Sequence, residues 1–392
     1  MNRRDFLRTT LAGAAVIPAA TPFPARTPIG ALAAGGGRKR LRDLGIVIGR
    51  LAPGPLNAIT DVRGVRVGHT TIIRGQGRGA VRTGVTALLP HEGNIYEERL
   101  FASSFGLNGW GEMTGLAAIE ETGLLATPVF LTGTYNVGIV QSAASAYLRK
   151  MNPAMGLSGE TAYPVVAECF DDFLSDTPSR PIAAKDVLAA IASASGGPVA
   201  EGAVGGGTGM TTFGFKGGIG TSSRKTGGGA TVGVLVMANT GRREDLRIDG
   251  APVGRAIRGF EERERRTKSI ILVAATDAPL LPYQLKKITK RVAMGLARVG
   301  SVSGTSSGDI ILAFSTANRV PRLPSGPVRD VRAVNDFLIT PLYQATVEAT
   351  QEAVLNALTS AETVVGRDGN TSYGIPLDQV EAFMRRYREL EN

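Results

Sequence analysis

Short apolar runs and longer amphipathic stretches alternate along this chain. Apolar runs bounded by turn residues predict buried strands, at residues 44–47, 64–68, 85–89, 129–131, 164–169, 231–238, 269–275 and 310–314. Apolar positions with a helical period predict helices, at residues 116–125, 139–147, 183–194, 282–296, 331–360 and 377–390. Three prolines mark residues 319–329 as a loop or linker. Strands this apolar cannot face water on either side, so we expect two sheets stacked inside helical layers.

An abrupt change from charged to apolar sequence occurs at Ser269. Residues 261–268 are almost all charged, whereas residues 269–275 have the apolar pattern of a buried strand. If the peptide bond after Lys268 were cut, Ser269 would become a new N-terminus. It would then carry a hydroxyl nucleophile and an α-amine that can act as its general base. The bond between Lys268 and Ser269 is therefore a candidate self-cleavage site.

The cysteine and histidine content limits other kinds of site. Cys169 is the only cysteine, so no disulfide can form within the chain. His69 and His91 are the only histidines. A zinc or iron site built from these residue types is not expected, and we predict neither a metal nor another cofactor.

The first 33 residues have the pattern of an export signal. Arg3 and Arg4 begin a twin-arginine motif, and the mildly apolar residues 9–20 are too few to form a permanent membrane anchor. Small residues at 31–33, or earlier at 18–20, offer a cleavage site. A basic tail is the alternative. We expect a protein that is folded before export by the twin-arginine pathway and is then periplasmic or secreted.

The positive charge of the chain has two interpretations. Removal of residues 1–33 takes away four arginines and one aspartate, which lowers the formal net charge from +10 to +7. Basic clusters such as residues 38–42 could contact nucleic acid, but no recognition motif accompanies them. A solvated basic face is favoured, and no nucleic-acid partner is predicted.

Three other segments could carry chemistry, and each also has a plainer structural explanation. Residues 202–209 are rich in glycine but lack the P-loop ending and the dinucleotide spacing, which favours close backbone packing over phosphate binding. Asn239 ends a strand, either as a turn former or as an oxyanion donor. Ser307 and Asp309 either form a turn or lie beside Ser269, bonding its hydroxyl and holding its ammonium group.

Several longer segments together resemble the DmpA-like family of self-processing serine aminopeptidases. The matching segments are residues 57–62, 81–87, 108–115, 205–210, 216–221, 269–279 and 307–318, within a region that covers nearly all of residues 42–320. The resemblance implies an α+β fold, a four-layer α/β/β/α sandwich arranged like an N-terminal-nucleophile hydrolase but connected differently. It implies one catalytic domain, residues 34–392, that cuts itself into an α chain (34–268) and a β chain (269–392). It also implies a homo-oligomer of these α/β heterodimers, such as a tetramer.

The resemblance also implies roles for individual residues. The family nucleophile falls on Ser269, its oxyanion asparagine on Asn239, and its paired serine and acid on Ser307 and Asp309. Relatives have a small or amide residue before the nucleophile, whereas this chain has Lys268, a departure that bears on the efficiency of self-cleavage.

The expected substrate pocket differs from the family pattern as well. A family tyrosine aligns near Phe170, so Tyr135 or water would have to supply the missing hydroxyl. Trp110 stands where relatives often carry a smaller polar residue, and we expect it to narrow the pocket or make it more apolar. We also expect Glu112, in the same matching segment, to contribute to the substrate pocket.

The activity implied by the resemblance is release of N-terminal amino acids from small peptides, amides or esters through an acyl-enzyme on Ser269. Two alternatives stay open. An acyl transferase like the ornithine acetyltransferases is disfavoured by the serine and by the export signal. The second alternative is a non-catalytic exported binding protein on the same fold. Lys268 and Phe170, which depart from the family pattern, are the residues that support it. The sequence does not choose between L-, D- and β-amino substrates.

Overall fold

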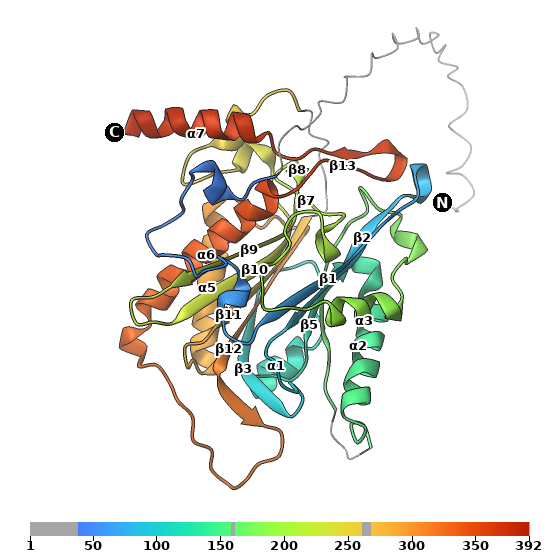
Figure 1. The fold of residues 1–392 in the computed structure, drawn as a ribbon, viewed down its shortest axis with the longest axis vertical. Coiled ribbons are helices and arrows are strands. Elements are labelled where there is room, and N and C mark those ends of the chain that lie inside the picture. Colours follow the sequence, from blue (N-terminus) through green and yellow to red (C-terminus); the bar gives the residue numbers. More distant parts are fainter. Residues whose placement is uncertain (1–37, 158–160, 261–267, 392) are drawn as a thin grey trace, which may run out of the picture. The chain divides into compact units, whose positions relative to one another are not determined.

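The computed structural model describes residues 38–157, 161–260 and 268–391 (Figure 1). The predicted export signal lies outside these ranges. The main helices are α1 Leu116–Thr122, α2 Val137–Met151, α3 Ala184–Ala192, α4 Val253–Ala256, α5 Pro282–Arg298, α6 Thr340–Thr359 and α7 Leu377–Glu391. In the described ranges, none of the helices has the length and hydropathy that crossing a bilayer requires.

The strands form two large sheets and two small ones. The strands are β1 Arg66–Arg74, β2 Val81–Leu89, β3 Glu98–Gly109, β4 Leu124–Leu125, β5 Val129–Gly133, β6 Val165–Cys169, β7 Thr211–Thr212, β8 Phe215–Lys216, β9 Gly218–Lys225, β10 Thr231–Asn239, β11 Lys268–Thr276, β12 Ser307–Pro321, β13 Val364–Val365 and β14 Thr371–Ser372. One large sheet has the order β1-β2-β5-β6 and the other β4-β3-β12-β11-β10-β9. The pairs β5/β6 and β11/β12 are parallel, and the other neighbours in these sheets are antiparallel.

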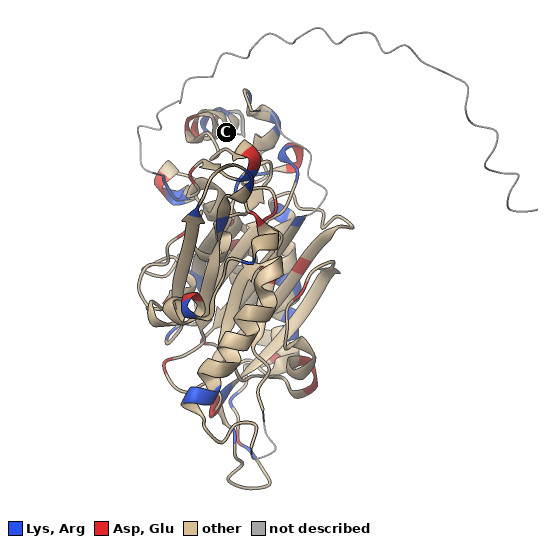
Figure 2. Ribbon diagram, turned by 90° about the vertical axis from the view of Figure 1, so that its right-hand side faces the viewer, with Lys and Arg blue, Asp and Glu red and all other residues tan. Residues whose placement is uncertain are grey.

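Burial on both faces of the sheets produces the layers. Along β11, Ile270 and Leu272 belong to the core beneath α5 and α6, whereas Ile271 and Val273 belong to the core between the two sheets. A third core joins the four-stranded sheet to α2 and α3. The central strands are mostly free of charge, and charged residues gather in helices, loops and strand ends (Figure 2). The predicted four-layer α/β/β/α sandwich is confirmed.

Two long strands, β3 and β9, lack the apolar pattern that predicted the other long strands. β3 mixes polar and apolar residues, and β9 contains glycine and serine instead of large apolar side chains. Close packing explains the small residues of β9, because a Cβ at Gly220 would lie 2.0 Å from the carbonyl oxygen of Ala353 in α6. The strand is therefore buried by backbone contact with a helix, which a hydrophobicity pattern does not register.

Several predicted boundaries are wrong. The expected strand 44–47 is a 3₁₀ turn, Leu41–Leu44, followed by an irregular segment. The expected helix 116–125 ends at Thr122, because Gly123 has a left-handed φ of 70° and β4 follows. The expected helix 331–360 begins only at Thr340, and β12 continues to Pro321, into the expected linker.

The sheet and its helices join the two predicted chains extensively. β9 and β10 precede Lys268, whereas β11 and β12 follow it in the same sheet. The buried Arg224 of β9 also pairs with Glu352 of α6, with 2.5 Å between Nη2 and Oε2. A cut after Lys268 would therefore leave the two pieces held by a shared sheet and a shared core.

Candidate active site

Ser269 lies at the point where three predicted segments meet. It is the second residue of β11 and is buried. Its register partner on β10 is Asn239, and its partner on β12 is Gly308. The pairing of three strands thus brings together residues that are far apart in the sequence.

The Ser269 hydroxyl is held against the bond that it is predicted to attack. Its Oγ donates to the carbonyl oxygen of Lys268 at 2.7 Å. The backbone N–H of Gly308 donates to the same Oγ at 3.2 Å. The nucleophile is therefore oriented by the sheet itself, in contact with the peptide group between Lys268 and Ser269.

Asn239 is fixed at both ends of its side-chain amide. Its Oδ1 accepts the N–H of Thr211 at 2.9 Å, and its Nδ2 donates to the carbonyl oxygen of Phe170 at 3.0 Å. Within the described part of the chain, the second hydrogen on Nδ2 has no acceptor. The amide is thus a preorganised donor next to Ser269, as an oxyanion site requires.

The glycine-rich loop, residues 202–209, is held in place by Lys216 and helps to position Asn239. The ammonium group of the buried Lys216 donates to the carbonyl oxygens of Gly207, Met210 and Gly217 at 3.1, 2.7 and 2.8 Å. A Cβ at Gly207 would lie 2.5 Å from the nitrogen of Ile219. The loop is packed closely against β9, as the sequence favoured, and it positions the Thr211 N–H that binds Asn239.

Among the described residues, neither Ser307 nor Asp309 forms a hydrogen bond with the Ser269 hydroxyl, which differs from one expectation. Ser307 instead donates to Asp309 Oδ1 at 2.6 Å. The cause is strand alternation: Gly308 is the partner of Ser269, so its two neighbours project to the other face of the sheet. Burial raises the pKa of Asp309, although the hydrogen bond from Ser307 opposes this.

Glu168 is a site residue that the sequence reasoning missed. Its Oε1 accepts the N–H of Glu112 at 3.0 Å, and its Oε2 accepts the Thr134 hydroxyl. A Cβ at Gly111 would lie 3.1 Å from this Oε1 and 3.0 Å from the Cα of Gly308. Burial raises the pKa of Glu168. The available signal was a single glutamate inside the apolar strand 164–169.

The predicted pocket residues fall into two groups. The rings of Tyr135 and Phe170 are neighbours, with 5.9 Å between their centroids. Tyr135 is half exposed and can therefore reach a ligand. Trp110 is largely exposed and lines a cavity that adjoins Lys268. The contact of Glu112 with the site is made by its backbone N–H, and its side chain is exposed.

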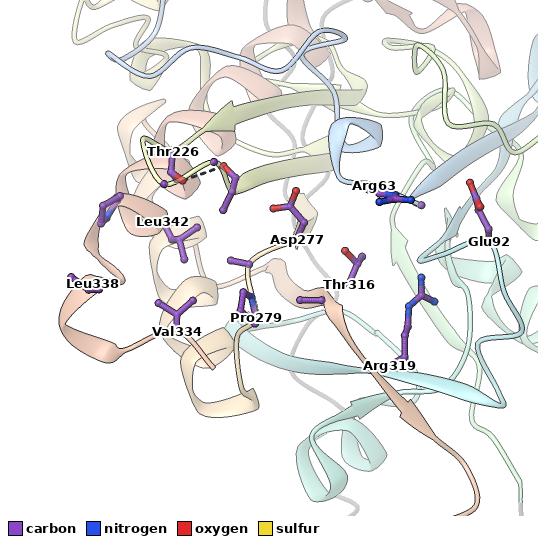
Figure 3. A pocket seen from close by; sticks show the side chains of 17 residues that line it. Arg63, Glu92, Thr226, Asp277, Pro279, Thr316, Arg319, Val334, Leu338 and Leu342 are labelled. Carbon is purple, nitrogen blue, oxygen red and sulfur yellow. Dashed lines mark hydrogen bonds between the residues drawn. The ribbon is translucent and has the colours of Figure 1, made fainter. Parts of the chain in front are cut away.

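Two cavities stand out, and the larger one is remote from Ser269. A cavity of about 820 Å³ is lined by Arg63, Asp277, Thr316 and Arg319 among others (Figure 3). Asp277 follows the last residue of β11 and Ser269 is near its first, so about 25 Å of strand separates them. The second cavity, about 670 Å³, includes Lys268 and Ser307 in its lining. The second cavity is the candidate substrate pocket, because Lys268, which is bonded to Ser269, and Ser307, which precedes the register partner of Ser269, both line it.

Asp171 places a titrating group directly beside the site. It follows Phe170, whose carbonyl binds Asn239, and a Cβ at Gly133 would lie 2.5 Å from its Oδ2. Burial raises the pKa of Asp171 from 3.8 to about 7. The native protein therefore binds a proton between these values that the unfolded chain does not, so stability falls as pH rises through this window.

We expect Asp171→Asn to flatten this pH dependence. In the wild-type protein, ionisation of Asp171 lowers the free energy of unfolding by about 3 kcal/mol between pH 5 and pH 8. Urea unfolding at both pH values measures it, in a Ser269→Ala background that removes the predicted cut. Asp249→Asn, at an exposed position, is the matched control. Equal pH slopes for the Asp171→Asn protein and its parent would contradict the assignment.

The fold and the site define a class: a serine hydrolase with its nucleophile near the start of a central strand of an α/β/β/α sandwich. The model of peptidase family S58 matches residues 57–372. The chain belongs to this family and is a serine aminopeptidase, which confirms the predicted resemblance.

Known relatives agree with this assignment. The chain is 42% identical over 374 residues to the beta-peptidyl aminopeptidase BapA of Sphingosinicella microcystinivorans, covering 90% of this chain and 93% of the relative. A solved Burkholderia sp. beta-aminopeptidase has a TM-score of 0.85 and 44% identity, over 89% of this chain and 99% of that one. The L-aminopeptidase D-Ala-esterase/amidase of Ochrobactrum anthropi has a TM-score of 0.82 and 40% identity, over 89% of this chain and 98% of that one, and its structure is described as a new variant among the Ntn hydrolase fold.

Proposed function

We propose that this protein is an exported aminopeptidase that activates itself by cutting the bond between Lys268 and Ser269. The observation that carries the proposal is the contact of the Ser269 Oγ with the Lys268 carbonyl, at 2.7 Å to its oxygen. In the first step Oγ attacks the carbonyl carbon, the C–N bond breaks, and the hydroxyl proton passes to the nitrogen of Ser269. An ester and a free α-amine result. Water then hydrolyses the ester, which leaves a carboxylate on Lys268 and restores the hydroxyl.

Turnover repeats this chemistry on a substrate. The new α-amine, with an unperturbed pKa of about 7.7–8, serves as general base near neutral pH. Ser269 attacks the first carbonyl of a peptide, amide or ester, and the second N–H of Asn239 stabilises the oxyanion. Asp309, which projects away from the Ser269 hydroxyl, would act on the backbone amine and not on the hydroxyl, as a counter-charge for the ammonium form of the base. Water resolves the acyl-enzyme.

Glu168 is the residue that would select substrates with a free amino terminus. Its buried carboxylate lies beside Gly111, which packs against Gly308, the register partner of Ser269. An ammonium group that enters this site gains a charge-assisted hydrogen bond. Because burial raises the pKa of Glu168, activity should fall on the acid side as the carboxylate takes up its proton.

Hydrolysis of alanyl p-nitroanilide and of its β-alanyl counterpart tests the proposed activity directly. Wild-type protein should cleave at least one of them and should not cleave an N-acetylated analogue. Glu168→Gln should lower kcat/KM by about 10-fold to 100-fold, since a buried charged hydrogen bond is lost. Glu121→Gln, a change in an exposed side chain of α1, is the control. Equal rates on acetylated and free substrates would contradict the role of Glu168.

Two further properties are part of this proposal. The shared sheet and the Arg224–Glu352 pair favour an α/β heterodimer that stays assembled after cleavage. Such heterodimers would form a homo-oligomer, whose mass light scattering measures.

The motif at Arg3 and Arg4 favours twin-arginine export. Cell fractionation of the protein and of its Arg3→Lys/Arg4→Lys variant tests this, because only the variant should remain in the cytoplasm.

A further inference from the structure

The cavity here named the Lys268 pocket is lined in part by Lys268, the residue that precedes the predicted cut. It is the cavity of about 670 Å³ described above, a volume typical of small-ligand pockets. Its walls come from the segment after β10, from residues 301–307 before β12, and from Trp110. The ammonium group of Lys268 donates to the carbonyl oxygen of Gly241 at 2.6 Å.

The walls of the Lys268 pocket suit a cationic group at the end of a flexible chain. Residues 301–307 contribute five hydroxyl side chains, and Gly241 contributes a backbone oxygen. Asp245 is a half-buried carboxylate that makes no ion pair within the described part of the chain, whereas Glu244 is exposed and lies 3.9 Å from Arg242. The indole of Trp110 offers a face to a cation. Hydroxyl, carbonyl and carboxylate oxygens all accept hydrogen bonds from an ammonium group, which has donors only.

We propose that the Lys268 pocket is the binding site for the side chain of the substrate's first residue, and that the enzyme prefers a lysine-like cationic residue there. This inference rests on the proposed function. Self-cleavage and turnover share one intermediate, an ester between an acyl group and the Ser269 Oγ. In self-cleavage the acyl group is that of Lys268; in turnover it is that of the substrate's first residue. A pocket that accommodates the Lys268 side chain during self-cleavage is in place to accommodate the side chain of the substrate's first residue during turnover.

The bonds formed and broken are the same in both reactions. The Oγ–C bond forms as the C–N bond of the leaving amine breaks, and the hydroxyl proton goes to that amine. Water then forms a new C–O bond as the ester breaks, and a carboxylate and a proton leave. The difference lies in the acyl residue's nitrogen: that of Lys268 is bonded to residue 267, whereas the substrate's is a free ammonium group beside Glu168.

Lysyl and norleucyl p-nitroanilides compare substrates of nearly equal length that differ in the terminal ammonium group. Wild-type protein should show a kcat/KM for the lysyl compound that is at least about 10-fold higher, the effect of one charge-assisted hydrogen bond. Asp245→Asn should narrow this ratio, and Asp249→Asn, at an exposed position outside the pocket lining, should leave it unchanged. Lys268→Met should slow self-cleavage more than Lys268→Arg does, because only arginine keeps a cation in the pocket.

The outcomes separate this inference from the proposed function. A norleucyl rate equal to or above the lysyl rate, in protein that is cut at Ser269 and hydrolyses both compounds, would overturn the lysine preference alone. Absence of hydrolysis together with an intact chain would overturn the proposed function and the inference with it. The comparison of two substrates on wild-type protein decides the matter even if a variant fails to fold.

Discussion

Ser269→Ala should leave the chain in one piece and reduce aminopeptidase activity by about 10⁴-fold or more. The substitution removes the Oγ that contacts the Lys268 carbonyl, so neither the ester nor the new α-amine can form. Both the nucleophile and its base are then missing from the site. Denaturing electrophoresis and mass spectrometry of the purified protein measure the cut, and p-nitroanilide hydrolysis measures the activity.

Ser222→Ala is the matched control for loss of a buried serine hydroxyl. Ser222 lies on β9, where its Oγ donates to the carbonyl oxygen of Ala349 at 2.7 Å, remote from the reacting bond. It should be cut and active like the wild type. Cleavage between residues 268 and 269 in the Ser269→Ala protein, or hydrolysis by protein whose chain is still intact, would rule out the self-activation mechanism.

Asn239→Ala should lower kcat by about 10²-fold to 10³-fold, because one oxyanion donor stabilises the transition state by about 3–4 kcal/mol. Self-cleavage should slow as well, since the same donor faces the oxygen of Lys268 during attack. The variant also leaves the N–H of Thr211 without its acceptor, which costs about 1–3 kcal/mol of stability. Steady-state kinetics and a time course of chain cleavage give the two rates.

Thr212→Ala separates the catalytic effect from the structural one. The Thr212 hydroxyl donates to the carbonyl oxygen of Ala238 at 2.6 Å, one residue before Asn239 and equally buried. Its loss should lower the melting temperature in a similar way while kcat stays close to the wild-type value. A Thr212→Ala protein as slow as Asn239→Ala would mean that Asn239 acts only by holding the strand end in place.

The apolar strands were predictable because the hydrophobicity of consecutive residues indicates that both faces of each strand are buried. Residues 231–238, 269–275 and 310–314 are apolar at odd and even positions, which only a strand covered on both faces tolerates, and this pattern already indicates stacked sheets. The charged segment that stops at Ser269 identified the candidate nucleophile in the same way. β3 and β9 were not predictable, because polar and small residues in them are buried by their neighbours.

What the amino-acid sequence determined by itself was the class of fold and the choice of Ser269 as candidate nucleophile, since both depend on residue types within short segments. Only the tertiary structure decided the partners of that serine. The register of β10, β11 and β12 places Asn239 and the Gly308 N–H beside it, and turns Ser307 and Asp309 to the other face. The stacking of the second sheet places Glu168 beside Gly111, which packs against Gly308. Hydrogen-bond register across 30 to 40 residues is a long-range property, and no local pattern of side chains specifies it.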